Sequence, residues 1–360
     1  MARGLVALHS TDPASVFLSI YARARHLIPA AIEASLYDDR VLLRMLGMRR
    51  TMFVVPIEAA PIIQAGCTNA IAVQQRRRYT QLVEAAGVGD GAWLAELEAA
   101  AAAALALRGE ATGAELSADV PQLRTPLVMA EGKTYGAIQN VTTWVLALPA
   151  ADGRIIRGRP RGSWTSSQYR WSPAESWLPA GMPELPVAAA RTELVRAWLA
   201  AYGPGTVADL RWWTGWTAGA VKQALTALRP EEVALDSGAT GFVLPEDTEP
   251  AADPEPWIAL LPALDPTAMG WSERSWYVGS HAPTLFDRSG NIGPTVWCNG
   301  RIVGGWAQRA TGEVVYRLLE DLGRDAAAEV ARAAAGLADW IGGVRVTPRF
   351  RTPLERELSA

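Results

Sequence analysis

This sequence has few of the residues that build metal or redox sites. Its 360 residues include two cysteines, three histidines and two lysines. Cys67 and Cys298 are isolated thiols, which form no metal-binding motif and predict no disulfide framework. The histidines lie too far apart in the sequence to suggest the spacing of metal ligands. We therefore expect no metal site and no cofactor.

Long apolar runs are also absent. No stretch approaches the roughly 18 consecutive apolar residues that a membrane span needs. The N-terminal residues Met1-Ala2-Arg3-Gly4 are not followed by the apolar core of a signal peptide. With 49% hydrophobic and 20% charged residues, the composition is typical of a globular protein, and the length suggests two or three domains. The sequence thus predicts a cytoplasmic protein with no membrane contact.

The basic residues are almost all arginine, and they are unevenly distributed. Lys133 and Lys222 lie in predicted helix-turn regions with no motif around them, so a Schiff-base lyase is not expected. The formal net charge is only -3. Residues 1–80 nevertheless hold ten arginines and five acids, residues 153–174 five arginines and no acid, and residues 231–255 eight acids and no base. A basic face for DNA is therefore possible, although ordinary surface patchiness gives the same pattern.

A pattern of helices followed by a hairpin is clearest in residues 187–244. Apolar spacing predicts a helix over Val187–Tyr202, which Gly203-Pro204-Gly205 ends. A short helix is expected over Val207–Trp213, and Thr217 is expected to begin another after a turn at Gly215. Two helices joined by a short glycine turn are typical of the helix-turn-helix. Alternating strands are expected to complete a wing over Val233–Leu235 and Phe242–Leu244.

Weaker versions of this order are predicted twice earlier in the chain. In the first, two helices precede two strands, over Asp12–Arg25, Pro29–Asp38, Arg40–Met48 and Thr51–Val55. In the second, three helices precede one strand of a hairpin, over Gly91–Leu107, Thr112–Ala118, Pro121–Glu131 and Arg154–Arg161. The segments share a pattern of elements and not a repeated sequence.

The last hundred residues favour strands. These are expected over Trp257–Leu261, Trp276–Val278, Thr295–Cys298, Arg301–Trp306, Val314–Leu318 and Val344–Thr347. Asn299-Gly300 is the strongest hairpin signal in the chain, and Ala326–Ile341 is expected to form a helix. The acidic, proline-rich stretch Pro245–Pro256 predicts a linker.

Together these patterns predict an α+β protein of three tandem winged-helix units followed by a β-rich C-terminal element. The expected boundaries are residues 1–60 for the first winged helix, 61–90 for a helical connector, and 91–185 and 186–248 for the second and third winged helices. Residues 249–256 are the expected linker, and residues 257–360 the expected β-rich domain with one helix.

The order of five short motifs resembles the winged-helix DNA glycosylase family of AlkZ and YcaQ. The motifs are Leu8-His9-Ser10-Thr11-Asp12-Pro13, Tyr169-Arg170-Trp171, LLPALDP at 260–266, GRIVGGW at 300–306 and RFRTPL at 349–354. The resemblance implies three winged helices in a C shape around duplex DNA. It also implies a DNA-repair enzyme, acting as a monomer, that hydrolyses the N-glycosidic bond of alkylated purines, including bulky adducts and crosslinks at guanine N7.

The sequence departs from the family at the catalytic motif. That motif is a glutamine, an apolar residue, then glutamine or aspartate directly before Asp-Pro, whereas His9, Ser10 and Thr11 occupy those positions here. Relatives also usually carry a helical stretch upstream, so we expect either that this protein lacks the stretch or that its start was assigned too late, and the first winged helix is then incomplete. Because DNA binding can survive such changes, a catalytically inactive regulator or lesion sensor is the alternative function.

An N7-alkylated purine makes modest chemical demands on a site. The base is already positively charged and leaves as a neutral molecule, so one oriented water suffices. His9 is expected to accept a proton from that water and Thr11 to hold it, since both side chains point the same way from an extended chain. A histidine that bonds locally or contacts phosphate is an equal alternative. Asp12 is a candidate for stabilising the cationic transition state, although Asp before Pro13 is more typical of a helix N-cap.

Arginines supply most candidates for contact with DNA. One set is expected at a hairpin tip and on an exposed ribbon without nearby acids: Arg49 and Arg50, then Arg157, Arg159 and Arg161. A second set is expected on the C-terminal element. Arg288 and Asn291 lie on the loop Leu285–Pro294, which the family resemblance implies as a candidate to probe the minor groove, and Arg345, Arg349 and Arg351 lie on the final strand. The run Arg76–Arg78 is more typical of solvated residues on a helix than of a DNA contact. The fifteen tryptophans are more typical of core packing than of stacking on bases.

Overall fold

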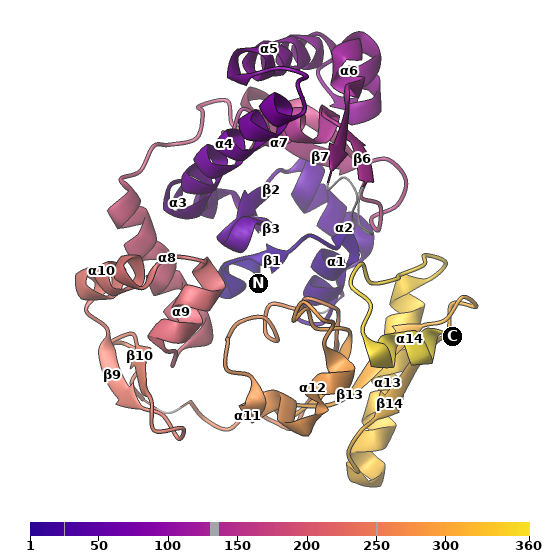
Figure 1. The fold of residues 1–360 in the computed structure, drawn as a ribbon. Helices are drawn as coiled ribbons and strands as arrows, with labels where there is room; N and C mark the ends of the chain where they lie inside the picture. The colour runs from indigo at the N-terminus through magenta and orange to yellow at the C-terminus, as the bar shows by residue number, and fades with distance from the viewer. Residues whose placement is uncertain (25, 130–136, 250) are drawn as a thin grey trace.

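Small antiparallel sheets alternate with helices along the chain (Figure 1). This computed structural model describes residues 1–24, 26–129, 137–249 and 251–360, so Lys133 lies outside the described residues. The predicted α+β class is confirmed. Within the described residues, no helix is both long and apolar enough to cross a membrane.

The N-terminal elements form a three-stranded sheet beside two helices. Strands β1 (Leu8–His9), β3 (Thr51–Pro56) and β2 (Leu42–Gly47) pair antiparallel in that order. Helix α1 (Pro13–Tyr21) begins at Asp12, whose carboxylate accepts a hydrogen bond from the Ala14 amide. The predicted N-cap is therefore confirmed. The second predicted helix is also present as α2 (Pro29–Glu33), which continues in a wider turn over Ala34–Asp38.

A mostly helical segment follows. Its helices are α3 (Ala60–Ile63), α4 (Asn69–Ala85), α5 (Gly91–Arg108), α6 (Gly113–Asp119) and α7 (Thr142–Ala151). A three-stranded sheet, ordered β4-β8-β7, contains β4 (Ala111–Thr112), β8 (Tyr169–Pro173) and β7 (Ile155–Pro160).

The helix predicted over Pro121–Glu131 is wrong. Residues 121–124 form one 3-10 turn, and β5 (Pro126–Met129) then pairs with β6 (Ala137–Asn140). The reason is local, because Pro126 disfavours helical geometry at Thr125, where ψ is 119°. The described helix that follows this hairpin is α7 instead.

The elements predicted most closely lie in residues 187–244. They are α8 (Val187–Tyr202), α9 (Val207–Thr214), α10 (Ala218–Leu228), β9 (Glu231–Ala234) and β10 (Thr240–Val243). Thr206 and Asp209 cap α9 reciprocally, and Thr217 caps α10. Gly215 has the positive φ of 77° that the turn between α9 and α10 requires. The grouping of these elements into a winged helix remains a prediction.

The C-terminal part is built on a four-stranded sheet. Its strands, in spatial order, are β11 (Ile258–Leu261), β12 (Thr295–Cys298), β13 (Arg301–Gln308) and β14 (Val314–Leu318). Helix α13 (Gly323–Ile341) packs on this sheet, and α14 (Pro353–Ser359) closes the chain. Short helices α11 (Ser275–Val278) and α12 (Ala282–Leu285) precede β12.

Two strands predicted in the C-terminal part are wrong. Trp276–Val278 is helical because the Glu273 carboxylate accepts hydrogen bonds from the Ser275 amide and hydroxyl and so starts a turn. Val344–Thr347 has no strand partner among the described residues. The Val346 amide donates instead to the side chain of Gln308, at 2.8 Å.

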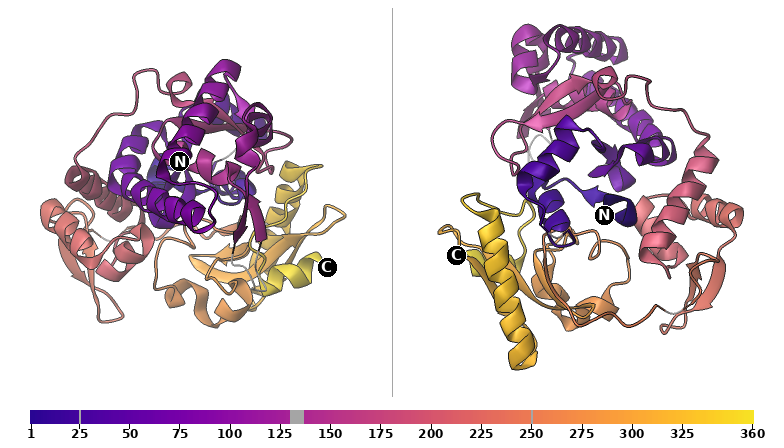
Figure 2. Two further views of the ribbon diagram at one scale, coloured as in Figure 1. Left: turned by 45° about the horizontal axis from the view of Figure 1, so that its top comes forward. Right: turned by 180° about the vertical axis from the view of Figure 1, so that it is seen from behind.

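One apolar cluster joins parts of the chain that are distant in sequence. It includes fully buried aromatic residues from α1, α8 and β13: Phe17, Trp198 and Trp306. The N-terminal sheet therefore lies between α8–α10 and the C-terminal elements, an arrangement visible from both sides of the molecule (Figure 2). Buried side chains between residues 83 and 171 form a separate apolar cluster.

A buried ion pair fixes the N-terminal segment to the C-terminal one. The two terminal guanidinium nitrogens of Arg23, Nη1 and Nη2, donate to the Asp265 carboxylate, at 2.9 and 2.6 Å. Ser19 donates a further hydrogen bond to Asp265, and Arg23 donates one to Thr267. The Asp265 side chain is completely buried. This network is the main polar link between α1 and the turn after β11.

Candidate active site

A cavity of about 260 Å³ lies where the N-terminal sheet meets the C-terminal elements. We call it the His9 cavity. Its wall is formed by His9, Thr11, Arg49, Arg50, Thr51, Met52, Leu264, Met269, Asn291 and Phe350. Five of the residues proposed from the sequence, namely His9, Thr11, Arg49, Arg50 and Asn291, therefore come together in one place.

His9 is buried in the N-terminal sheet and kept neutral. Its strand position pairs it with Phe53, whose ring centroid lies 4.5 Å from the imidazole. Burial, with smaller contributions from the charges of Arg49 and Arg274, lowers the pKa of His9 to about 3. Nε2 lies 3.4 Å from an Arg49 nitrogen, which can only donate, so Nε2 accepts and Nδ1 carries the proton. His9 can thus orient a water molecule but is a weaker base than a free imidazole.

Three polar groups of the motif are buried without a hydrogen-bond partner among the described residues. They are His9 Nδ1, Thr11 Oγ1 and the Ser10 Oγ between them. His9 and Thr11 line the cavity, whereas Ser10 does not. A buried donor or hydroxyl left unpaired costs about 1–3 kcal/mol, so a polar ligand in the cavity would relieve that cost.

Arg49 lies at the predicted hairpin tip, between β2 and β3, but it is less exposed than predicted. It lies in the turn Met48–Arg50 with a φ of 53°. Its guanidinium packs 4.1 Å from the Trp212 ring, and Arg274 lies 4.4 Å from the same ring. Burial, and then the charge of Arg274, lower the pKa of Arg49 to about 10. Arg49 is therefore half-buried over His9, and Arg50 alone is the exposed residue expected at a hairpin tip.

Trp212 and Arg274 were missed as parts of the site. Trp212 was assigned to packing from its place in a short helix, and Arg274 belongs to no motif. Their role comes from the contact of α9 and the segment before α11 with the turn Met48–Arg50. No local signal in the sequence reveals that contact.

Both oxygens of the Asp12 carboxylate accept hydrogen bonds from backbone amides. One oxygen accepts from the Ala14 amide and the other from the Arg349 amide, both at 3.1 Å. Asp12 does not line the His9 cavity. The first contact is the N-cap of α1, the second joins Asp12 to the C-terminal segment, and a role in catalysis remains a prediction.

The predicted ribbon Arg157–Arg161 is less exposed than expected. Arg159 contacts the Asp38 carboxylate at 2.8 Å, which contradicts the expectation of no nearby acid. The Arg157 guanidinium packs 4.9 Å from the Trp171 ring of the neighbouring strand. Burial lowers the pKa of Arg157 to about 10. Arg161 is exposed. The difference arises because β8 and the turn over Ala34–Asp38 pack against β7.

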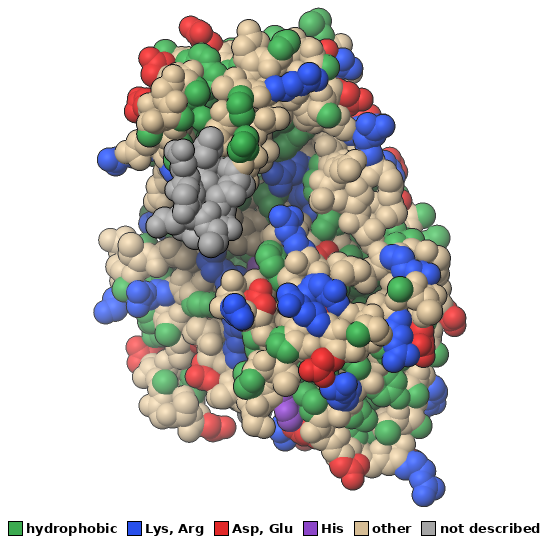
Figure 3. Space-filling model, turned by 45° about the vertical axis from the view of Figure 1, so that its right-hand side comes forward, with side chains coloured by type: hydrophobic (Ala, Val, Ile, Leu, Met, Phe, Trp, Pro, Cys, Tyr) green, Lys and Arg blue, Asp and Glu red, His purple; other side chains and the backbone are tan. Residues whose placement is uncertain are grey.

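The C-terminal candidates do not alternate along a strand. Arg345 donates to the Ala310 carbonyl at 3.1 Å, and Arg351 contacts Glu355 at 2.7 Å. Asn291 donates to Asp287 within its own loop. Arg288, Arg349 and Arg351 nevertheless line one open depression together with Arg356. Basic side chains also gather in and around a hollow on the face shown in Figure 3.

The low pKa of His9 predicts a loss of stability in acid. Between pH 6.5 and 3 the unfolded chain protonates His9 and the folded chain does not, so stability falls as pH falls, by up to about 1.4 kcal/mol per pH unit. Urea unfolding at pH 6.5 and 4.5 should show wild type losing about 2 kcal/mol more than His9→Gln. Equal losses in the two proteins would contradict the burial of an uncharged His9.

Comparison with known proteins gives two matches. The model of the AlkZ-like DNA glycosylase family matches residues 2–340. The solved structure of Streptomyces sahachiroi DNA glycosylase AlkZ is similar in fold, with a TM-score of 0.71 and 22% sequence identity over 96% of this chain and 91% of that chain. No curated protein sequence matches significantly.

Proposed function

The chain belongs to the AlkZ-like DNA glycosylase family, and on that premise we propose that it releases N7-alkylated purines from double-stranded DNA as a monomer. The single observation that carries this proposal is the pair of unpartnered groups, His9 Nδ1 and Thr11 Oγ1, on the wall of one cavity. They replace the amide and acid groups of the family motif with one imidazole and one hydroxyl.

The proposed mechanism needs only a positioned water. The N7-alkylated base departs as a neutral molecule, so the protein need not protonate it. His9 and Thr11 orient the water toward C1′, and the neutral imidazole adds no further charge beside the developing oxocarbenium ion. The proton of the attacking water passes to solvent as the product forms, because a group with a pKa of about 3 does not retain it near neutral pH.

Arg49 and Arg274 set a condition on this mechanism. Two guanidinium groups beside His9 oppose the entry of a cationic base unless DNA phosphates offset their charge. We therefore propose that Arg49 leaves His9 Nε2 and contacts a phosphate of the bound strand. Asn291 and Arg288, on the loop at the cavity edge, are proposed to contact the minor groove.

The test is base release from a duplex carrying a single N7-methylguanine and, in parallel, a single bulky N7 adduct. Alkali converts each abasic product into a strand break, which is quantified on a gel. Strand breaks at the lesion, and none in the matched guanine duplex, are the expected result. If the protein binds both lesion duplexes but releases neither base, the substrate class is wrong and the inactive lesion sensor becomes the better interpretation.

A further inference from the structure

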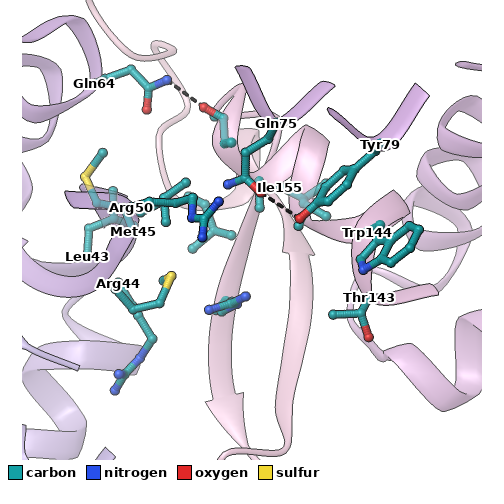
Figure 4. Close-up of a pocket in the computed structure, with 18 of the residues that line it drawn as sticks. Leu43, Arg44, Met45, Arg50, Gln64, Gln75, Tyr79, Thr143, Trp144 and Ile155 are labelled. Carbon is teal, nitrogen blue, oxygen red and sulfur yellow. Dashed lines mark hydrogen bonds between the residues drawn. The ribbon is translucent and has the colours of Figure 1, made fainter. Parts of the chain in front are cut away.

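A second, larger cavity of about 400 Å³ adjoins the His9 cavity (Figure 4). Arg50 and Met52 line both. The second cavity lies between β2, α4, α7 and β7, and Figure 4 shows Arg50 reaching from one side toward Gln75 and Tyr79 on the other. Four arginines line it, and no acid does among the described residues: Arg44, Arg50, Arg78 and Arg157. We call it the arginine cavity.

None of these four arginines forms an ion pair with a described residue. Arginines two positions away on the same elements do. On α4, Arg76 contacts Asp152 at 2.8 Å while Arg78 is unpaired, and on β7, Arg159 contacts Asp38 while Arg157 is unpaired. Arg77 on α4 also lacks an ion pair in the part of the chain that the structure describes and lies outside the cavity, but among these arginines it is Arg78 and Arg157 that bring charge without a counterion to the cavity wall.

Arg44 is the most constrained of the four. It is only 4% exposed, and Nη1 donates to the Ser10 carbonyl at 3.2 Å. Its Nε and Nη2 have no partner among the described residues. Arg157 is also enclosed, and the nearby charge of Arg44 adds to the lowering of its pKa by burial. The two like charges, together with the unsatisfied donors of Arg44, would be stabilised by an anion that accepts from both residues.

We propose that the arginine cavity binds a backbone phosphate of the DNA strand, next to the nucleotide held at the His9 cavity. Guanidinium groups match the geometry of phosphate oxygens and can donate two parallel hydrogen bonds. The wall shared through Arg50 allows one strand to occupy both cavities. Because Arg44 also holds the Ser10 carbonyl, a phosphate bound there fixes the backbone between His9 and Thr11. The inference rests on the proposed function, in which the His9 cavity receives the target nucleotide.

The test compares Arg78→Gln with Arg77→Gln. Both residues are exposed on α4, and only Arg78 lines the cavity. Affinity for an undamaged duplex is measured over a series of NaCl concentrations. Losing one phosphate contact should make the slope of log K against log[salt] shallower by about 0.9. We expect this change in Arg78→Gln and in Arg157→Gln, and a wild-type slope in Arg77→Gln. Wild-type slopes in all three would overturn the proposal, and Arg78→Gln decides it if Arg157→Gln does not fold.

A second measurement separates DNA phosphate from a free anion. Melting temperatures are compared in sodium sulfate and sodium chloride at matched ionic strength, for wild type and Arg157→Gln. A sulfate stabilisation that Arg157→Gln lacks, with unchanged DNA slopes, would assign the cavity to a free anion and overturn the DNA claim. Base release is measured separately. If the salt slopes of the variants change but wild type releases no base, the proposed function is rejected and the phosphate site is not. If wild type releases the base but the variant slopes equal that of wild type, the phosphate site is rejected and the proposed function is not.

Discussion

Replacing His9 with alanine is expected to slow single-turnover base release on the order of 100-fold, the lower range for loss of a group that manages a proton or water. DNA affinity should stay close to that of wild type, because His9 is buried and its neutral ring carries no charge for phosphate. The measurement is the rate of alkali-sensitive breaks with enzyme in excess over an N7-methylguanine duplex, together with binding to an undamaged duplex.

Ser10→Ala is the matched control for His9→Ala. Ser10 is adjacent in the chain and equally buried, but it does not line the cavity. Its contact with Arg44 uses the backbone carbonyl, which alanine retains. Base release by Ser10→Ala should therefore match wild type. A similar slowing in both variants would mean that the motif tolerates no change in packing, and the assignment of a water-orienting role to His9 would fail.

The largest effect on stability is expected from Asp265→Ala. The change leaves the Arg23 guanidinium without its carboxylate at a largely buried position, and it removes the acceptor of the Ser19 hydroxyl. Breaking one side of a buried ion pair typically costs about 3–5 kcal/mol. The free energy of unfolding in urea should fall by about that amount, because the contact between α1 and the turn after β11 is weakened.

The double variant Arg23→Met with Asp265→Ala tests the physical reason. Removing both charges eliminates the unpaired guanidinium, so the double variant should be more stable than Asp265→Ala alone. If the two are equally unstable, the loss comes from packing in the Leu264–Asp265–Pro266 turn, where Leu264 has a φ of 57°, and not from the charge left behind.

The elements that the sequence predicted best are those specified by nearby residues. The helix over Val187–Tyr202 and the caps Thr206 and Thr217 depend on apolar spacing and on side chains within three positions. The strand Thr295–Cys298 ends at the Asn299-Gly300 turn for the same reason. The failures depend on distant partners instead. The sequence predicted a strand over Val344–Thr347, but the Val346 amide donates to the Gln308 side chain instead of to a strand.

The candidate site was predicted residue by residue but not as an arrangement. The motif before Pro13 identified His9 and Thr11, and the C-terminal loop identified Asn291. Their meeting in one cavity depends on the packing of the whole chain. The electrostatics were the least predictable part, because the pKa of His9 depends on burial, Arg49 and Arg274, and Arg159 on β7 is paired with Asp38 of the turn over Ala34–Asp38.

The residues that form the wall of the His9 cavity lie far apart in the sequence and are therefore synthesised at different times. His9 and Thr11 leave the ribosome before Asn291 and Phe350 do, because they precede them in the chain. A nascent chain therefore carries the motif long before it has the other half of the wall. Products terminated before Leu264 would hold His9 without Leu264, Met269 or Asn291 beside it, so they would lack that half of the wall.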